Sequence, residues 1–310
     1  MDLSLSVVIP TFNGARTIGL QLQSLASQLN APAFEVIVVD NGSTDAVRQV
    51  VSSWSDQLIL RCVDANEHQG VSYARNVGVR EARAVNIAFC DDDDCTGEGW
   101  VAAACNALNQ VEFVTGSVTD LPDDEFQHGL EHVRSLAPQP TSSGITQRDG
   151  DRTYPIVMGG NCAMTRALAL KLEGFDQSFF PGAEDNDLGL RLVRSGHTLY
   201  RCESMVVLAR TRPSDQGAWL RSYQGGLMHM QLCARHNLWQ VSPHLRHPHW
   251  LVDLLRACAA ALVMLLRPSR RDWRAMGSRI ALRLGQSVGF VKYGLLKRIP
   301  PRQLGLGLES

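Results

Sequence analysis

The segments Leu5-Ser-Val-Val-Ile9 and Phe34-Glu-Val-Ile-Val-Val39 decide the fold. Both are short apolar runs rich in β-branched residues, and they end at Pro10 and Asp40. Four apolar residues recur at helical spacing between them: Ile18, Leu22, Leu25 and Leu29. A strand, a helix and a second strand in this order predict a βαβ unit with parallel strands.

The same alternation continues along the chain. Leu58-Ile-Leu60 predicts a third strand, residues 71–83 a helix, and Val85-Asn-Ile-Ala-Phe89 a fourth strand. The N-terminal half is therefore predicted to be a doubly wound, mostly parallel α/β sheet. Such sheets bind ligands at the carboxyl ends of their strands, which is where Thr11, Asp40 and Asp91 fall.

The second half has a different composition. Residues 119–154 are rich in Pro, Asp, Ser, Gln and Gly, which predicts a long surface excursion. A helix is expected from Asp187 to Ser195, closed by Gly196. Pro and His residues beyond about Val241 mark a boundary. We therefore expect a first domain at 1–240, divided into 1–118 and 119–240, followed by a basic helical extension at 241–310.

Composition and charge limit the classes of function that the chain can have. The 310 residues are 45% hydrophobic, enough for one substantial core or two small ones, and the formal net charge of −1 argues against a general nucleic-acid binder. Residues 246–302 nevertheless hold 12 of the 30 Lys and Arg residues and only two acids, Asp253 and Asp272. A basic tail follows an acidic body.

Cysteine usage and hydropathy favour a cytoplasmic protein. The eight cysteines are scattered without a C-x-x-C pair, as is typical of reduced, buried thiols. The N-terminal residues lack the positive region of a secretory signal. The longest apolar run, Ala257 to Leu266, is shorter than the ~20 residues of a spanning helix.

The strongest chemical signal is Asp91-Asp-Asp-Asp94, directly after the apolar run Ile87-Ala-Phe-Cys90. Adjacent carboxylates repel one another unless a cation neutralises them. Oxygen ligands suit Mg²⁺ or Mn²⁺, which bridge to substrate phosphates. A solvated acidic turn is the alternative that the four residues alone leave open.

Several segments in order resemble the family 2 glycosyltransferases of the GT-A fold, over roughly residues 4 to 200. The first four are Ser6-Val-Val-Ile-Pro-Thr-Phe-Asn-Gly14, Glu35-Val-Ile-Val-Val-Asp-Asn-Gly-Ser-Thr-Asp45, Gly70-Val-Ser-Tyr-Ala-Arg-Asn76 and Phe89-Cys-Asp-Asp-Asp-Asp94. The others are Gly159-Gly-Asn161, Gly174-Phe-Asp176 and Gly182-Ala-Glu-Asp-Asn-Asp-Leu-Gly-Leu-Arg191. Each segment is weakly specific alone, and the ordered set is specific.

The resemblance implies a role for each matching residue. The residues implied to bind the nucleotide sugar are Pro10, Thr11, Phe12, Asn13, Asp40, Arg75, Asp91 and Asp92. Asp93, with Asp91, is implied to hold Mg²⁺ or Mn²⁺ as a D-x-D motif. Asp185 is implied to be the general base with Glu184 beside it, and Gly160 and Asn161 to lie on the acceptor side. The resemblance also implies that 1–118 is the nucleotide-binding half of a glycosyltransferase domain and 119–240 the acceptor half. Asp40-Asn-Gly-Ser-Thr-Asp45 is equally typical of a turn with a helix N-cap.

The expected activity is the transfer of a sugar from a nucleotide diphosphate to an acceptor hydroxyl. A cation would stabilise the leaving diphosphate and Asp185 would take the acceptor's proton, which implies a single displacement with inversion. The alternatives are a sugar nucleotidyltransferase and an inactive sugar-nucleotide-binding protein. A nucleotidyltransferase needs several cations near its N-terminal loop to bind a triphosphate, and residues 11–19 hold only Arg16. Loss of Asp93 or Asp185 would have indicated an inactive protein, and both are present.

One departure from the family pattern concerns the third metal ligand. Related enzymes often have a histidine after the last strand, but this chain reads Met205-Val-Val-Leu-Ala-Arg-Thr-Arg212. Either Arg210 or Arg212 would suit a diphosphate, and a surface position is equally compatible. The cluster His244, His247 and His249 lies among prolines and favours a turn over a metal site.

The tail predicts a peripheral contact with the inner face of a membrane. Six residues fall near one helical face: Trp273, Met276, Ile280, Leu284, Ser287 and Val291. Arginines crowd the same segment, and a basic amphipathic helix suits an anionic bilayer. Packing on the catalytic domain and formation of a homodimer remain alternatives. The acceptor is expected to be a glycan, a lipid-linked molecule or a small molecule.

Overall fold

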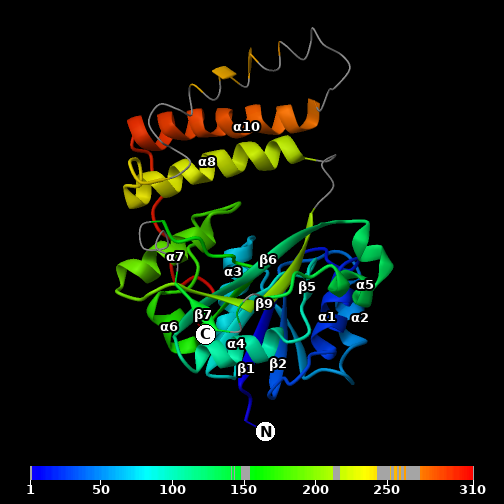
Figure 1. Cartoon of the computed structure of the whole chain (residues 1–310). Helices are drawn as coiled ribbons and strands as arrows, with labels where there is room; N and C mark the ends of the chain where they lie inside the picture. The colour runs from blue at the N-terminus through cyan, green and yellow to red at the C-terminus, as the bar shows by residue number, and fades with distance from the viewer. Residues whose placement is uncertain are drawn as a thin grey trace. The chain divides into compact units, whose positions relative to one another are not determined.

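The computed structural model describes residues 2–140, 142, 144–147, 154–211, 217–242, 252, 255, 256, 258, 259, 262 and 273–309. The histidine cluster at 244–249 and most of the apolar run at 257–266 lie outside these residues. The chain forms two compact units (Figure 1). The first contains Met1–Gln177, Glu184–Arg212 and Gln303–Ser310, and the second contains Ser178–Ala183 and Pro213–Arg302.

The first unit alternates strands and helices. Its elements are β1 (Leu5–Thr11), α1 (Ile18–Ala26), β2 (Phe34–Asp40), α2 (Val47–Ser52), β3 (Leu60–Asp64), α3 (Val71–Glu81), β4 (Asn86–Cys90), β5 (Cys95–Thr96), α4 (Trp100–Leu108), β6 (Phe113–Pro122), η1 (Glu125–His128), α5 (Leu130–Ser135), β7 (Ile145–Thr146), β8 (Asn161–Thr165), α6 (Arg166–Lys171), α7 (Glu184–Arg194) and β9 (Tyr200–Thr211).

These strands form one sheet in the order β3-β2-β1-β4-β8-β6-β9-β5, and β7 pairs with β9. Strands β3, β2, β1 and β4 are parallel, as the βαβ pattern predicts. Strand β8 enters antiparallel between β4 and β6. The predicted α/β fold class is confirmed. Thr11 pairs with Asp40, and Asp40 with Asp64, so three polar strand ends lie at one level.

Helices cover both faces of the sheet, so its central strands are buried on both sides. All seven residues of β1 are buried. One core cluster joins Leu22 of α1 and Trp100 of α4 to one face, and another joins Val77 of α3 and Leu168 of α6 to the other. This explains why the strands are continuous apolar runs rather than alternating patterns.

Several predicted boundaries shift. The third strand is Leu60–Asp64 rather than 58–60, α3 ends at Glu81, and α7 begins at Glu184 rather than at Asp187. The predicted excursion at 119–154 contains the end of β6 together with η1, α5 and β7. Strand β6 extends this far because it continues to pair with β9 after a register shift between Gly116 and Ser117.

The last residues of the chain return to the first unit, which the predicted extension at 241–310 did not include. Leu306 and Leu308 pack against the core cluster that contains α3. Asn76 donates to the Leu306 carbonyl at 2.8 Å, and Arg80 to the Glu309 carbonyl at 3.0 Å. Burial of the two leucines supplies the reason for this return. The functional boundaries at 118 and 240 stay predictions.

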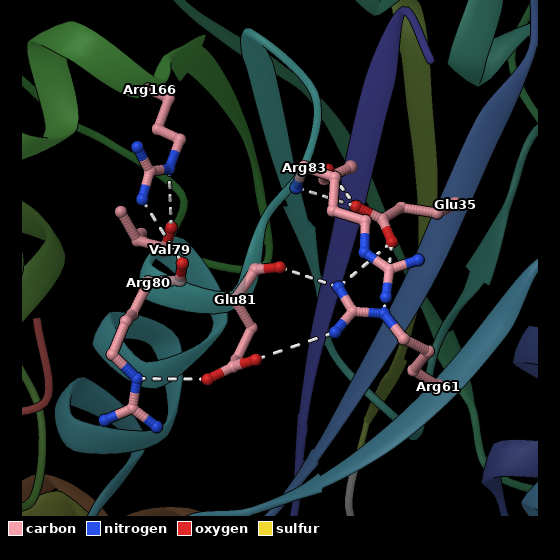
Figure 2. A network of polar contacts seen from close by, with 8 residues as sticks. Glu35, Arg61, Val79, Arg80, Glu81, Arg83 and Arg166 are labelled. Carbon is pink, nitrogen blue, oxygen red and sulfur yellow. Dashed lines mark hydrogen bonds and ion pairs between the residues drawn. The ribbon is translucent and has the colours of Figure 1, made fainter. Parts of the chain in front are cut away.

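A polar network closes the amino ends of the central strands (Figure 2). Glu35 is fully buried and accepts hydrogen bonds from Ser6 Oγ and from the Arg83 amide. Arg61 pairs with Glu35 and also with Glu81 at the end of α3. A buried carboxylate is tolerated because its oxygens are all satisfied. This end of the sheet is structural, and the opposite end carries the acidic turn.

The second unit contains α8 (Ala218–His236), α10 (Trp273–Gly289) and η4 (Phe290–Leu295). A Cβ on Gly285 would lie 2.0 Å from the Tyr223 carbonyl, and one on Gly226 would lie 2.2 Å from that of Leu282. Glycines therefore let the backbones of α8 and α10 touch. None of the helices in the described part of the chain combines the length and the apolar character needed to span a bilayer.

Candidate functional site

The acidic turn at Asp91–Asp94 follows β4, and its carboxylates have different partners. Arg75 Nη2 donates to Asp91 Oδ1 at 3.0 Å. Asp92 accepts a hydrogen bond from Thr11 Oγ1 at the end of β1. Asp94 is buried and accepts from the backbone amide of Arg210 at 3.0 Å. The turn is thus tied to three elements that are far apart in the sequence.

Electrostatic repulsion is concentrated in this turn. Burial, together with the neighbouring charges of Asp91 and Asp93, raises the pKa of Asp94 to about 8. A carboxyl group with such a pKa resists ionisation until a cation approaches. The turn is half-buried at Asp91, Asp92 and Asp93 and buried at Asp94, so a fully solvated turn does not describe it.

The donor set fits a hard divalent cation bound together with a substrate. The turn offers carboxylate oxygens, which Mg²⁺ and Mn²⁺ accept. In the described residues, no group of three or more His, Cys, Asp and Glu side chains is arranged to hold a metal. A cation here would therefore depend on phosphate oxygens and water for its remaining ligands, as Mg²⁺ at phosphate sites does.

Arg75 joins the two predicted halves of the site. Its side chain on α3 is buried, and it donates to Asp91 on one side and to Glu184 Oε1, at 2.8 Å, on the other. The guanidinium also lies 5.2 Å from the centre of the Phe175 ring. A planar cation with several donors suits such a bridge. Sequence analysis placed Arg75 near the nucleotide without detecting its pairing with Glu184.

The paired acids stand at the first turn of α7. Burial, together with the charge of Asp185, raises the pKa of Glu184 to about 7. Burial also raises the pKa of Asp185. Asp185 Oδ2 accepts a hydrogen bond from the Gly159 amide at 3.2 Å. Among the residues that the structure describes, neither Glu184 Oε2 nor Arg75 Nε has a hydrogen-bond partner, although both atoms are buried. Unsatisfied buried polar atoms favour a site that is completed by a ligand or water.

Three glycines let the backbone approach these side chains. A Cβ on Gly160 would lie 2.3 Å from Asp91 Oδ2, and one on Gly159 would lie 2.8 Å from Arg75 Nη1. A Cβ on Gly14 would lie 2.1 Å from Asp92 Oδ2. The predicted acceptor-side residue Gly160 therefore contacts the acidic turn directly.

The predicted nucleoside loop lies beside the ends of β1 and β2. Asn13 has a left-handed backbone, with φ of 56°, and its side-chain oxygen accepts from the Thr44 amide at 2.8 Å. Phe12 is 56% exposed, so its ring is accessible from solvent. Pro10 is buried within β1.

Asp40 is buried, and both of its carboxylate oxygens have protein partners. Oδ1 accepts from the Ser43 amide at 2.8 Å, and Oδ2 accepts from Arg48 Nε at 2.7 Å. Arg48 also pairs with Asp64 at the end of β3. Sequence analysis missed Arg48, although its position eight residues after Asp40, in the first turn of the following helix, was a usable signal.

Asn161 has a different environment from Gly160. Its side chain is fully buried, accepts from Trp100 Nε1 at 2.8 Å and donates to the carbonyls of Ser117 and Met205. These contacts hold β6 and β9 together where their register shifts. The geometry gives this side chain a structural role, and its acceptor-side assignment stays an untested prediction.

A cavity of about 1160 Å³ opens elsewhere on the first unit, beside η1 and α5. Gln23, Glu98, His128 and Arg134 are among its lining residues. None of the predicted site residues lines it. This cavity is therefore separate from the predicted site.

Comparison with known proteins agrees with the fold. The model of glycosyl transferase family 2 matches residues 6–172, which is more than half of the chain, so the chain belongs to this family. The resemblance seen in the sequence is confirmed. A second family model, described as the N-terminal domain of galactosyltransferase, matches residues 139–212.

Similar proteins include enzymes with different substrates. Validoxylamine A glucosyltransferase of Streptomyces hygroscopicus subsp. limoneus is 43% identical over 106 residues, which are 33% of this chain and 23% of that protein. Chondroitin synthase of Escherichia coli is 24% identical over 242 residues, covering 68% of this chain and 35% of the synthase. The chain thus spans only about a quarter to a third of the length of these relatives.

Solved structures show the same fold at low identity. A mannosyltransferase from Pyrobaculum calidifontis, in complex with GDP-Man and Mn²⁺, superposes with a TM-score of 0.64 at 19% identity, covering 93% of this chain and 88% of that one. Staphylococcus aureus TarS in complex with UDP-GlcNAc gives a TM-score of 0.55 at 19% identity, covering 94% and 92%.

Proposed function

We propose that this protein is an inverting glycosyltransferase that moves a sugar from a nucleotide diphosphate to an acceptor hydroxyl. The observation that carries the proposal is the Arg75 bridge, which brings the acidic turn and the acids of α7 together through Asp91 and Glu184. Donor-side and acceptor-side chemistry must lie within one sugar ring of each other for a single displacement. Nucleotide-sugar complexes among the structural neighbours support the same class of donor.

Asp93, with Asp91, would hold Mg²⁺ or Mn²⁺ against the donor diphosphate. When bound, the cation would stabilise negative charge on the leaving nucleotide. The crowding of four adjacent carboxylates supports this assignment: burial is the main cause of the raised pKa of Asp94, and the charges of Asp91 and Asp93 add a repulsion that a cation would relieve. The Mn²⁺ in the Pyrobaculum calidifontis complex supports the choice of metal.

Asp185 would take the proton from the acceptor hydroxyl. The Gly159 amide orients its carboxylate, and burial raises its pKa towards a value at which a carboxylate is a better base. Glu184 is held by Arg75 and would order the acceptor side next to it. One base facing the reacting carbon opposite the leaving group gives inversion.

Metal-assisted binding of the donor nucleotide tests this proposal. Isothermal titration of the protein with GDP and with UDP, each with and without Mn²⁺, should show tighter binding with the metal. Asp93→Ala should remove most of that gain while leaving the melting temperature close to that of the wild-type protein. Metal-dependent binding that is unchanged in Asp93→Ala would refute the D-x-D assignment.

The alternative of a sugar nucleotidyltransferase has less support. Its triphosphate substrate needs several cations near the N-terminal loop. Arg16 is the only basic residue between Thr11 and Gly19, and it pairs with Asp123 at 3.4 Å. An inactive nucleotide-sugar-binding protein is separated from the enzyme by transfer itself, measured as release of nucleoside diphosphate in the presence of an acceptor.

The second unit supports a peripheral contact with an anionic membrane. On α10 and η4, Leu284, Val288, Val291 and Leu295 are exposed at intervals of three or four residues, whereas Ala281 is buried. Two residues of the predicted apolar face, Leu284 and Val291, belong to this stripe. No acidic residue occurs in the sequence between Asp272 and Glu309, whereas this segment carries Lys292, Lys297 and Arg298 close to the stripe. Each cation near an anionic surface contributes about 1 kcal/mol.

Flotation with liposomes tests this contact. The protein should float with vesicles that contain anionic lipid at low salt and should stay in the dense fraction with neutral vesicles. Val288→Glu with Val291→Glu should abolish flotation. If the wild-type protein does not float, or if it floats equally with neutral vesicles, the membrane proposal is wrong. A lipid-linked acceptor would meet such a tethered enzyme in the plane of the membrane.

A further inference from the structure

Arg210, near the end of β9, occupies the place where sequence analysis left the third metal ligand open. Its backbone amide donates to Asp94 Oδ1 at 3.0 Å, and its Nε donates to the carbonyl of Asp93 at 2.9 Å. One residue therefore contacts both of the last two positions of the acidic turn, although it is more than a hundred residues away in the sequence.

The rest of the guanidinium faces the η1 segment. Nη1 donates to Asp123 Oδ1 at 2.8 Å, and the guanidinium carbon lies 4.1 Å above the centre of the Phe126 ring. The side chain of Arg210 is only 8% exposed. Its donation to Asp123 is the largest cause of the lowered pKa of that carboxyl group. Arg210 is thus held on three sides by the protein.

We propose that Arg210 is a positioning residue that clamps the acidic turn against η1, and that it does not neutralise the donor diphosphate itself. This inference rests on the proposed function, because the turn that it positions is the proposed metal site. A guanidinium offers several donors in a fixed plane, so it can fix the direction of a backbone carbonyl and a carboxylate partner at once. Holding the Asp93 carbonyl and the Asp94 carboxylate limits the directions in which the Asp93 side chain can point.

The competing role, direct contact between Arg210 and phosphate, makes the opposite prediction for Asp123. If Arg210 served as a cation for the diphosphate, then Asp123 would compete with the donor, and removing its charge would strengthen donor binding. If Arg210 is a clamp, Asp123 supports it, and removing that support should weaken metal-assisted binding. The sign of one substitution therefore separates the two roles.

The experiment measures the dissociation constant of GDP or UDP, whichever the protein binds, in the presence and absence of Mn²⁺. Arg210→Lys keeps the positive charge and loses the planar set of guanidinium donors. It should weaken the Mn²⁺-assisted binding by about 10- to 100-fold, as is typical for residues that orient metal ligands. Asp123→Asn should weaken it in the same direction. Binding without metal should change little in either variant.

Arg16→Gln is the matched control. Arg16 shares Asp123 with Arg210 but is 71% exposed and has no contact with the acidic turn in the described structure. Its substitution should leave the Mn²⁺-assisted affinity unchanged, which would show that loss of the Arg210 contact, rather than release of Arg16, causes the effect of Asp123→Asn.

Amide hydrogen exchange of the metal-free protein gives a second readout. Arg210→Lys should speed exchange at residues 91–95 while the melting temperature and exchange in β1 and β2 stay near their wild-type values. The clamp proposal fails if Arg210→Lys keeps wild-type metal-assisted affinity, or if Asp123→Asn tightens binding. By contrast, absence of any Mn²⁺ effect in the wild-type protein would refute the proposed metal site itself, and unchanged exchange at residues 91–95 would then refute the clamp separately.

Discussion

Replacing Glu184 by Gln should remove a pH dependence of stability that the structure assigns to this residue. Burial and the neighbouring Asp185 raise the pKa of Glu184 from its ordinary value of 4.5 to about 7. The folded protein therefore holds a proton between these two pH values that the unfolded chain releases. At about 1.4 kcal/mol per pH unit, ionisation across this interval costs about 3 kcal/mol of folding stability.

The sign of the change in stability with pH follows from the linkage between proton binding and folding. The contribution of Glu184 is fully present below pH 4.5, where both states are protonated, and it is lost as the pH rises through about 7. Relative to Glu184→Gln, the wild-type free energy of unfolding should therefore fall by about 3 kcal/mol between pH 4 and pH 8. Other titrating groups are present in both proteins, so the difference isolates Glu184 and its coupling to Asp185.

Urea unfolding at half-unit intervals from pH 4 to pH 8, followed by circular dichroism, measures this difference. The same comparison in an Arg75→Gln background extends the test. The Arg75 cation lowers the pKa of Glu184, so its loss should raise this pKa above 7 and extend the pH interval over which stability falls. A difference between wild-type and Glu184→Gln proteins that is flat with pH would refute the reasoning. A difference that rises with pH would mean that the ion pair with Arg75 outweighs burial.

Three further substitutions test other parts of the structure. Asp185→Asn should keep the affinity for nucleotide and lower the rate of sugar transfer by about 10²–10⁴-fold if this residue is the general base, and near wild-type turnover would reject that role. Gly160→Ala should weaken Mn²⁺-assisted nucleotide binding, because its Cβ would lie 2.3 Å from Asp91 Oδ2, and calorimetry showing unchanged affinity would contradict the close approach. Gly285→Ala should lower the free energy of unfolding by about 1–3 kcal/mol, because the new Cβ would meet the Tyr223 carbonyl. Gly277→Ala on the same helix is the control: a Cβ at this position would have no atom within 4 Å, so urea denaturation should show no loss of stability.

Local patterns in the sequence predicted the nucleotide-side half of the fold. Strands β1, β2 and β4 and helix α1 follow from apolar runs and helical spacing, because both depend on residues that are near one another in the chain. The acidic turn was visible for the same reason, since four adjacent carboxylates need no tertiary information to be recognised. The family resemblance placed Asp185 and Glu184 in the site on short motifs of this kind.

The tertiary structure decided which of these groups meet. Arg75 and Glu184 are 109 residues apart, and Arg210 and Asp93 are 117 apart. Both contacts depend on the order β4-β8-β6-β9, in which a late strand and a late helix return to the acidic turn. The return of Leu306 to the core beside α3 has the same origin. The sequence by itself determined the elements and the acids, because these depend on neighbouring residues, whereas their partners depend on long-range packing that no local pattern encodes.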